Sequence, residues 1–248
     1  MLVRLELKLK SDGEINYQMM TLFHGALIEA LPPEYADYLH LSQLHPYTQH
    51  LEFREGSWYW IVCGLNKEAV QKIIHEALMP LESIVIKKKN LKIDIVEKHY
   101  KEMTYKFLMD RFYEEESDRY IRLQFVSPTA FKQRGRYVFY PEMRCVFRSL
   151  MNKYDSVDNG HAMIDEDTLE QLTGNAQIVR YDLKSVSFCL EGVKIPAFIG
   201  KVTIKMHGSQ TMTNFANMLF EFGEYSGVGI KTALGMGCIK LIRERGRQ

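Results

Sequence analysis

Apolar and charged residues alternate strictly near the start of the chain, which predicts a half-buried β-strand. The odd positions from Val3 to Leu9 are apolar, and the even positions from Arg4 to Lys10 are charged. Because successive side chains of a strand point to opposite faces, one face of this strand should meet a core and the other should stay polar.

The rest of the first half contains segments with the periodicity of helices and segments with the alternation of strands. Apolar residues spaced three and four apart predict helices, of which the first stops at Pro32-Pro33 and the last ends before Pro80. The predicted elements are a strand at 2–10, helices at 17–31 and 34–41, paired strands at 51–53 and 58–63, a helix at 67–78, and strands at 83–86 and 91–96. This order is that of the split βαβ, or ferredoxin-like, unit.

An acidic run at 114–118 predicts a solvated connector, after which the same order of elements begins again. Pro141 opens a predicted helix, Asp165 caps another, and Gly192 with Pro196 marks the turn between two strands. The predicted elements are a strand at 120–125, helices at 141–154 and 165–172, strands at 178–190 and 196–206, a helix at 211–222 and a strand at 237–242.

The two cycles predict an α+β fold of two tandem ferredoxin-like (RRM-like, βαββαβ) domains, residues 1–118 and 119–248, and 248 residues suffice for two such domains. The 32 Lys and Arg nearly balance the 31 Asp and Glu. The formal charge of +1 excludes a uniformly basic nucleic-acid coat but not a local basic face. The charged N-terminus gives no secretory signal, and no apolar run approaches the ~20 residues of a membrane span, so we expect a cytoplasmic protein.

The four cysteines stand far apart without a CxxC pair, and the histidines do not follow a zinc-finger spacing. Reduced thiols among apolar neighbours are the simplest interpretation. We therefore expect neither a metal ion nor another cofactor.

Four glycines within eleven residues mark the segment 223–241, at Gly227, Gly229, Gly235 and Gly237. The segment should follow a helix and lead into a strand, which is the reverse of a dinucleotide-binding loop, and it does not complete a Walker A motif. Glycines let the backbone approach a ligand closely, so we expect N–H groups here to face an anion. The alternative is a glycine-rich turn between helix and strand.

This segment resembles the C-terminal glycine-rich loop of the RAMP superfamily of CRISPR proteins, and most closely that of the CRISPR repeat-processing endoribonuclease, the sixth CRISPR-associated family. Four further motifs agree with that family and extend the resemblance over essentially the whole chain. They are His24-Gly25, Tyr38-Leu39-His40, Ser127-Pro128-Thr129-Ala130-Phe131 and Lys194-Ile195-Pro196-Ala197-Phe198-Ile199-Gly200. The family implies the same tandem ferredoxin-like architecture.

The resemblance implies an endoribonuclease that cleaves precursor CRISPR RNA within the repeat for antiviral defence, without a metal ion. The RNA 2′-hydroxyl would attack the adjacent phosphodiester, leaving a 2′,3′-cyclic phosphate and a 5′-hydroxyl. Such a reaction needs a base, an acid and groups that stabilise the charge on the phosphorus centre. His40 matches the family's recurrent histidine, and with His24 it forms the expected catalytic acid/base pair, the two roles being left open.

The chain departs from the family at the third catalytic position, which several members fill with tyrosine and lysine. No lysine lies between Lys10 and Lys67, and Arg54 is the only arginine there. The substitutes left open are His45, Tyr17, Tyr47 or a basic residue of the second half.

Six basic residues and one acidic residue lie between Arg122 and Arg148, interleaved with aromatic residues. This pattern suits phosphate contacts and base stacking, although a solvated hairpin tip would also produce it. A basic tail of Lys240, Arg243, Arg245 and Arg247, opposed by Glu244, extends the same tendency. The predicted RNA-binding residues are Lys132, Arg134, Arg136, Arg144, Arg148, Gly227, Gly229, Lys231, Gly235 and Gly237.

The expected partner is CRISPR repeat RNA, with the product either retained or passed to a multi-subunit CRISPR effector complex, and no membrane is involved. A monomer and a homodimer both remain open. The alternative function is a non-catalytic RAMP subunit that binds CRISPR RNA as a scaffold, and the paired histidines of the first domain favour the nuclease.

Overall fold

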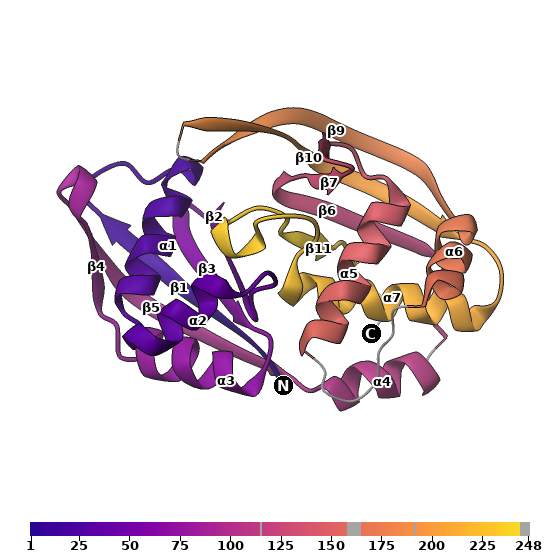
Figure 1. The fold of residues 1–248 in the computed structure, drawn as a ribbon, viewed down its shortest axis with the longest axis horizontal. Helices are drawn as coiled ribbons and strands as arrows, with labels where there is room; N and C mark the ends of the chain where they lie inside the picture. Colours follow the sequence, from indigo (N-terminus) through magenta and orange to yellow (C-terminus); the bar gives the residue numbers. More distant parts are fainter. Residues whose placement is uncertain (115, 158–164, 191, 244–248) are drawn as a thin grey trace. The chain divides into compact units, whose positions relative to one another are not determined.

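The computed structural model describes residues 1–114, 116–157, 165–190 and 192–243, and their contacts form two compact units (Figure 1). The first unit consists of Met1–Met103 together with Lys231–Gly235, and the second holds the rest of the described chain. Helix α4 (Tyr105–Glu114) precedes the predicted connector and belongs to the second unit, so the two units separate in the chain before residue 118.

The first unit is a five-stranded antiparallel sheet in the order β2-β3-β1-β5-β4. Its strands are β1 (Leu2–Ser11), β2 (Tyr47–Arg54), β3 (Ser57–Gly64), β4 (Ser83–Ile86) and β5 (Leu91–Met103). Its helices are η1 (Tyr17–Met19), α1 (Met20–Glu29), α2 (Pro33–Leu41), α3 (Lys67–Ala69), the π-helix η2 (Val70–Leu78) and η3 (Lys87–Lys89). Strand β3 lies between β1 and β2, which is the split βαβ arrangement.

The second unit repeats this arrangement in a four-stranded sheet of order β11-β6-β10-β9, with a separate hairpin of β7 and β8. Its strands are β6 (Tyr120–Thr129), β7 (Phe131–Gln133), β8 (Arg136–Val138), β9 (Ala176–Leu190), β10 (Val193–Met206) and β11 (Ile239–Leu241). Besides α4, its helices are α5 (Met143–Val157), α6 (Glu166–Asn175) and α7 (Gln210–Ser226). The predicted α+β fold of two ferredoxin-like domains is confirmed.

The alternating pattern of β1 places its apolar side chains in the core of the first unit. Val3, Leu5 and Leu7 are fully buried, and they belong to one apolar cluster with Phe23 of α1. The Phe23 ring meets the Trp60 ring of β3 edge to face, with centroids 5.2 Å apart. Burial of Phe23 therefore fixes the orientation of α1 on the sheet, and with it the position of the next residue in the chain, His24.

One prediction about the second sheet is wrong. Pro196 does not mark a turn, because it lies inside β10, where it stands opposite Ser187 of β9. The pairing of β10 with β6 begins only at Phe198, so β10 has no second neighbour at Pro196 that would require its N–H. Gly192, with a φ of 84°, adopts the left-handed backbone expected between these strands.

Helix α6 begins as its sequence predicts, because the side chain of Asp165 accepts hydrogen bonds from the backbone N–H groups of Asp167 and Thr168. Within the described ranges, no helix combines the length and the apolar character that crossing a membrane requires.

Candidate active site

His24 lies half-buried on α1, where two side chains of β2 meet its ring. The Tyr47 hydroxyl lies 3.1 Å and the Gln49 side-chain nitrogen 3.2 Å from His24 Nδ1. Tyr47 and Gln49 occupy alternate positions of the same strand, so both point to the face of the sheet that α1 covers.

The contacts of Gln49 settle which nitrogen of His24 carries a proton. Its oxygen accepts a hydrogen bond from the indole N–H of Trp60 at 2.9 Å, and its nitrogen donates to the carbonyl of Ala233 at 2.7 Å. The nitrogen therefore has an N–H left to donate to His24 Nδ1, which must act as acceptor. In the neutral ring the proton then resides on Nε2, the nitrogen left to meet a ligand.

His45 interacts electrostatically with His24 and with His40. Burial, and next the neighbouring His45, lowers the pKa of His24 to about 4. Burial also lowers the pKa of His45, with a further contribution from His40. His40 itself is exposed near the end of α2. In the first unit, His45 thus interacts with each of the two predicted catalytic histidines.

His45, one of the several substitutes for the third catalytic residue, lies close to Tyr47. Its Nδ1 is buried and has no hydrogen-bond partner among the described residues, and its ring lies 5.7 Å from that of Tyr47. Its only sequence signal is the density of histidines between residues 24 and 50. That signal is imprecise, because His50 projects from β2 onto the opposite face to Gln49, where it lies 3.9 Å from Glu52.

The central residues of the glycine-rich segment belong to the first unit and adjoin this site. The short helix η4 (Thr232–Leu234) includes Ala233, whose carbonyl accepts the hydrogen bond from Gln49. A side chain at Gly235 would meet Met20 of α1, with a Cβ only 2.5 Å from its Cγ. Lys231 is exposed at the start of η4 in the left-handed conformation, with a φ of 57°.

The four glycines of the segment do not use their N–H groups as the sequence analysis expected. The N–H groups of Gly227, Gly235 and Gly237 donate to the carbonyls of Gly223, Thr232 and Pro128, and that of Gly229 donates to the Ser149 hydroxyl. All four glycines have a positive φ, between 62° and 98°. The backbone conformation thus accounts for these glycines, because their N–H groups are occupied within the chain.

The flanks of the glycine-rich segment pack on the motif at 127–131, inside the second unit. The Ser127 hydroxyl accepts a hydrogen bond from Cys238 N–H at 2.9 Å, and the Ala130 carbonyl accepts one from Ile230 N–H at 3.0 Å. A Cβ on Gly229 would lie 2.3 Å from the Ala130 oxygen. Two motifs that the sequence shows separately therefore form one hydrogen-bonded structure.

Helix α5 supports the same segment through two side chains one turn apart. Ser149 accepts the N–H of Gly229 at 2.7 Å, and the Lys153 ammonium donates to the carbonyls of Ser226 and Gly227 at 2.9 and 3.1 Å. Lys153 is buried, and this burial lowers its pKa to about 7.

This burial predicts a pH dependence of stability. An unfolded lysine has a pKa of about 10.4, so between about pH 7.5 and about 9.5 the unfolded chain binds more protons and stability rises with pH. We expect urea unfolding to show a rise of up to about 1.4 kcal/mol per pH unit in the wild type relative to Lys153→Met. A difference between the two proteins that stays constant across this range would contradict the prediction.

The predicted RNA-binding residues of the second unit fall into two groups. Lys132, Arg134 and Arg136 are exposed on the β7–β8 hairpin, whose turn is formed by Arg134 and Gly135 in left-handed conformation. Exposed aromatic side chains follow at Phe139 and Tyr140. This hairpin keeps the combination of charge and aromatic surface that the sequence suggested.

Arg144 and Arg148 face α6 instead, because both pair with Glu166. Arg144 also lies 4.0 Å from Glu170. The +5 window from 122 to 148 is therefore partly neutralised by residues outside it. In the predicted basic tail, Arg243 pairs with Glu224 at 3.1 Å, whereas Arg245 and Arg247 lie outside the described residues.

Comparison with known proteins decides the family. The sequence profile described as CRISPR-associated endoribonuclease Cas6 matches residues 123–239. The CRISPR-associated endoribonuclease Cas6 of Streptococcus thermophilus is 38% identical over 219 residues, which cover 88% of this chain and 89% of the relative. The chain belongs to the Cas6 family of CRISPR-associated endoribonucleases.

Two further comparisons agree with the Cas6 assignment. Cas6 of Mycobacterium tuberculosis is 30% identical over 248 residues, covering 97% of this chain and 78% of the relative. A solved Cas6 product complex matches the fold with a TM-score of 0.79 at 22% identity, over 98% of this chain and 100% of the solved one. The resemblance of the sequence motifs to this family is thus confirmed.

Among the described residues, the candidate acid/base groups are histidines rather than a metal site or a paired cysteine. No group of three or more His, Cys, Asp or Glu side chains that could hold a metal ion is found among them. The cysteines are free, with Cys63 and Cys238 buried, Cys145 half-buried and Cys189 exposed.

Proposed function

We propose that this chain is an endoribonuclease that cleaves precursor CRISPR RNA within the repeat, by metal-independent attack of a 2′-hydroxyl with His24 and His40 as the acid/base pair. The observation that supports this most is the Gln49 side chain, which donates to both His24 Nδ1 and the Ala233 carbonyl. The Gln49 side chain thus connects His24 to the η4 part of the glycine-rich segment. Family membership supports RNA cleavage as the activity.

The two histidines suit different steps. An RNA phosphate beside His24 favours the imidazolium and so raises its depressed pKa. In that form Nδ1–H donates to the Tyr47 hydroxyl, 3.1 Å away, instead of accepting from Gln49, and Nε2–H faces the RNA. His24 then donates to a phosphate oxygen and passes a proton to the departing 5′-oxygen. His40 is exposed and accepts the proton of the 2′-hydroxyl.

RNA binding in this proposal depends on separate positive groups. Lys231 contributes an exposed charge at the start of η4, two residues before the Ala233 carbonyl that Gln49 contacts. The β7–β8 hairpin supplies Lys132, Arg134 and Arg136 for phosphates, with Phe139 and Tyr140 available for stacking. The four glycines determine the backbone conformation of the segment, and their N–H groups, which donate within the chain, do not bind RNA in this proposal.

The test is an analysis of the product ends in the presence of EDTA. With purified protein and a synthetic repeat RNA, we expect undiminished cleavage in excess EDTA and a 5′ fragment that ends in a 2′,3′-cyclic phosphate. Loss of cleavage on chelation, or a 3′-hydroxyl end, would refute the mechanism. Binding of the repeat without any cleavage would instead favour the non-catalytic scaffold.

A further inference from the structure

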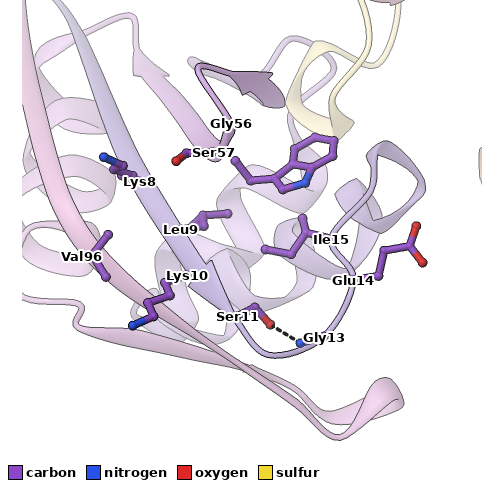
Figure 2. Close-up of a pocket in the computed structure, with 11 residues that line it drawn as sticks. Lys8, Leu9, Lys10, Ser11, Gly13, Glu14, Ile15, Gly56, Ser57 and Val96 are labelled. Atoms are coloured by element: carbon purple, nitrogen blue, oxygen red, sulfur yellow. Dashed lines mark hydrogen bonds between the residues drawn. The ribbon is translucent and has the colours of Figure 1, made fainter.

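An open cleft of about 460 Å³ lies at one end of the first sheet (Figure 2). It lies between the end of β1 with the loop that follows it and the turn that joins β2 to β3. Lys8, Lys10, Glu14 and Trp58 are among its lining residues.

Trp58 belongs to an aromatic cluster at this cleft that solvent reaches. Its ring meets Tyr17 edge to face at 4.9 Å and Phe53 at 5.3 Å. Tyr17 is 46% exposed and Phe53 is 51% exposed, although both are large apolar side chains. Grouped aromatic rings open to water provide a surface on which flat ligands can stack.

The register of β2 relates this cluster to the candidate active site. Phe53 pairs with Trp58, and four residues earlier Gln49 pairs with Val62, so Gln49 and Phe53 lie on the same face of the strand. At about 3.3 Å per residue, the ring cluster lies about 13 Å from the side chain that holds His24. A few unpaired nucleotides can bridge such a span.

The charges of the cleft favour a polyanion. Two of its lining residues are lysines, Lys8 and Lys10, and one is acidic, Glu14. Figure 2 shows the two lysines on the β1 side and the carboxylate of Glu14 on the opposite side, turned away from them. Lys8 lies 3.4 Å from Glu97, and Lys10 is exposed at the end of the strand. Lys10 alternates with Leu9, which pairs with Trp58, so its side chain leaves the opposite face of β1 from the rings and adds positive charge at this end of the sheet.

We propose that the cleft with Tyr17, Phe53 and Trp58 is a stacking subsite for an unpaired nucleotide that flanks the cleavage position. This inference rests on the proposed function, because it assumes that RNA passes His24. The occupant is single-stranded RNA, because the aromatic faces take any base and the two lysines of the cleft favour a polyanion.

The experiment compares three repeat RNAs made uncleavable by a 2′-deoxy nucleotide at the scissile position. One ends close to the cleavage position on both sides, one adds four unpaired nucleotides 5′, and one adds four 3′. In the wild type we expect one extension to tighten binding about tenfold or more, as base stacking does in other proteins. Stacking should also quench the fluorescence of Trp58.

Variants assign that gain to the cleft. Trp58→Ala and Phe53→Ala should abolish the gain from the extension while keeping the affinity for the short RNA, and Trp58→Phe should retain most of it. Lys10→Ala should reduce it. Tyr113→Ala serves as the matched control, because this side chain is 74% exposed on α4.

Two results would overturn the inference: neither extension improves binding, or Phe53→Ala and a folded Trp58→Ala both keep the full gain. Cleavage of ordinary short RNA by the wild type is scored separately. If that cleavage fails, the proposed function is wrong, whereas intact cleavage without any gain from an extension rejects the subsite alone.

Discussion

A repeat RNA with a single 2′-deoxy nucleotide immediately 5′ of the scissile phosphate should not be cleaved at that position. In the proposed reaction the missing hydroxyl is the nucleophile, and the protein supplies no substitute for it. An attacking group held beside its target reaches effective concentrations of about 10⁵ M or more, and water cannot replace that advantage. The measurement is single-turnover cleavage followed on a gel.

The control is the same RNA with the deoxy nucleotide moved one position in the 3′ direction. That RNA should be cleaved at nearly the normal rate, and both RNAs should bind with similar affinity, because a single hydroxyl contributes little to a contact dominated by phosphates. Cleavage of the first RNA at the normal rate would show that water or a protein group attacks the phosphate, whatever the histidines do.

The fold could be predicted because its signals are local. The alternation from Val3 to Leu9 and the helical spacing before Pro32 depend on residues a few positions apart, and these patterns place the same faces in the core of the structure. Pro196 was misjudged because a proline is tolerated wherever a strand lacks a second neighbour, and sequence alone does not show where β6 stops pairing.

The candidate site was harder to predict because its contacts join distant parts of the chain. Gln49 has no motif of its own, and its role depends on Ala233, 184 positions away. The charge of the window at 122–148 was overestimated for the same reason, because Glu166 pairs with Arg144 and Arg148 from outside it. The glycines were recognised from their spacing, but their hydrogen-bond partners were not.

Gln49 also changes what can be expected of the two histidines. An isolated histidine is equally suited to accept or donate a proton near neutral pH. His24 is not, because its Nδ1 already accepts hydrogen bonds and burial keeps its ring neutral in the free protein. Of the two acid/base roles that the sequence left open, we therefore assign the acid to His24 and the base to His40.

Replacing His40 by alanine should slow single-turnover cleavage of repeat RNA by about 10²- to 10⁴-fold, the usual contribution of one positioned proton-transfer group. His24→Ala should cause a loss of similar size, since leaving-group protonation and 2′-hydroxyl deprotonation belong to the same step. His75→Ala is the matched control, because this histidine is exposed on η2 and packs near the Tyr100 ring. The control should cleave at the wild-type rate.

The two histidine variants should differ in a second measurement. With RNA bound, adding imidazole should partly restore His40→Ala, because His40 is exposed and its place is open to solvent, but should restore His24→Ala less, because that position is half-buried between α1 and β2. If both variants cleave at the wild-type rate, the acid/base assignment is wrong. If only His24→Ala is fully active, His40 acts with another group, and His45, which interacts with both histidines, becomes the next residue to replace.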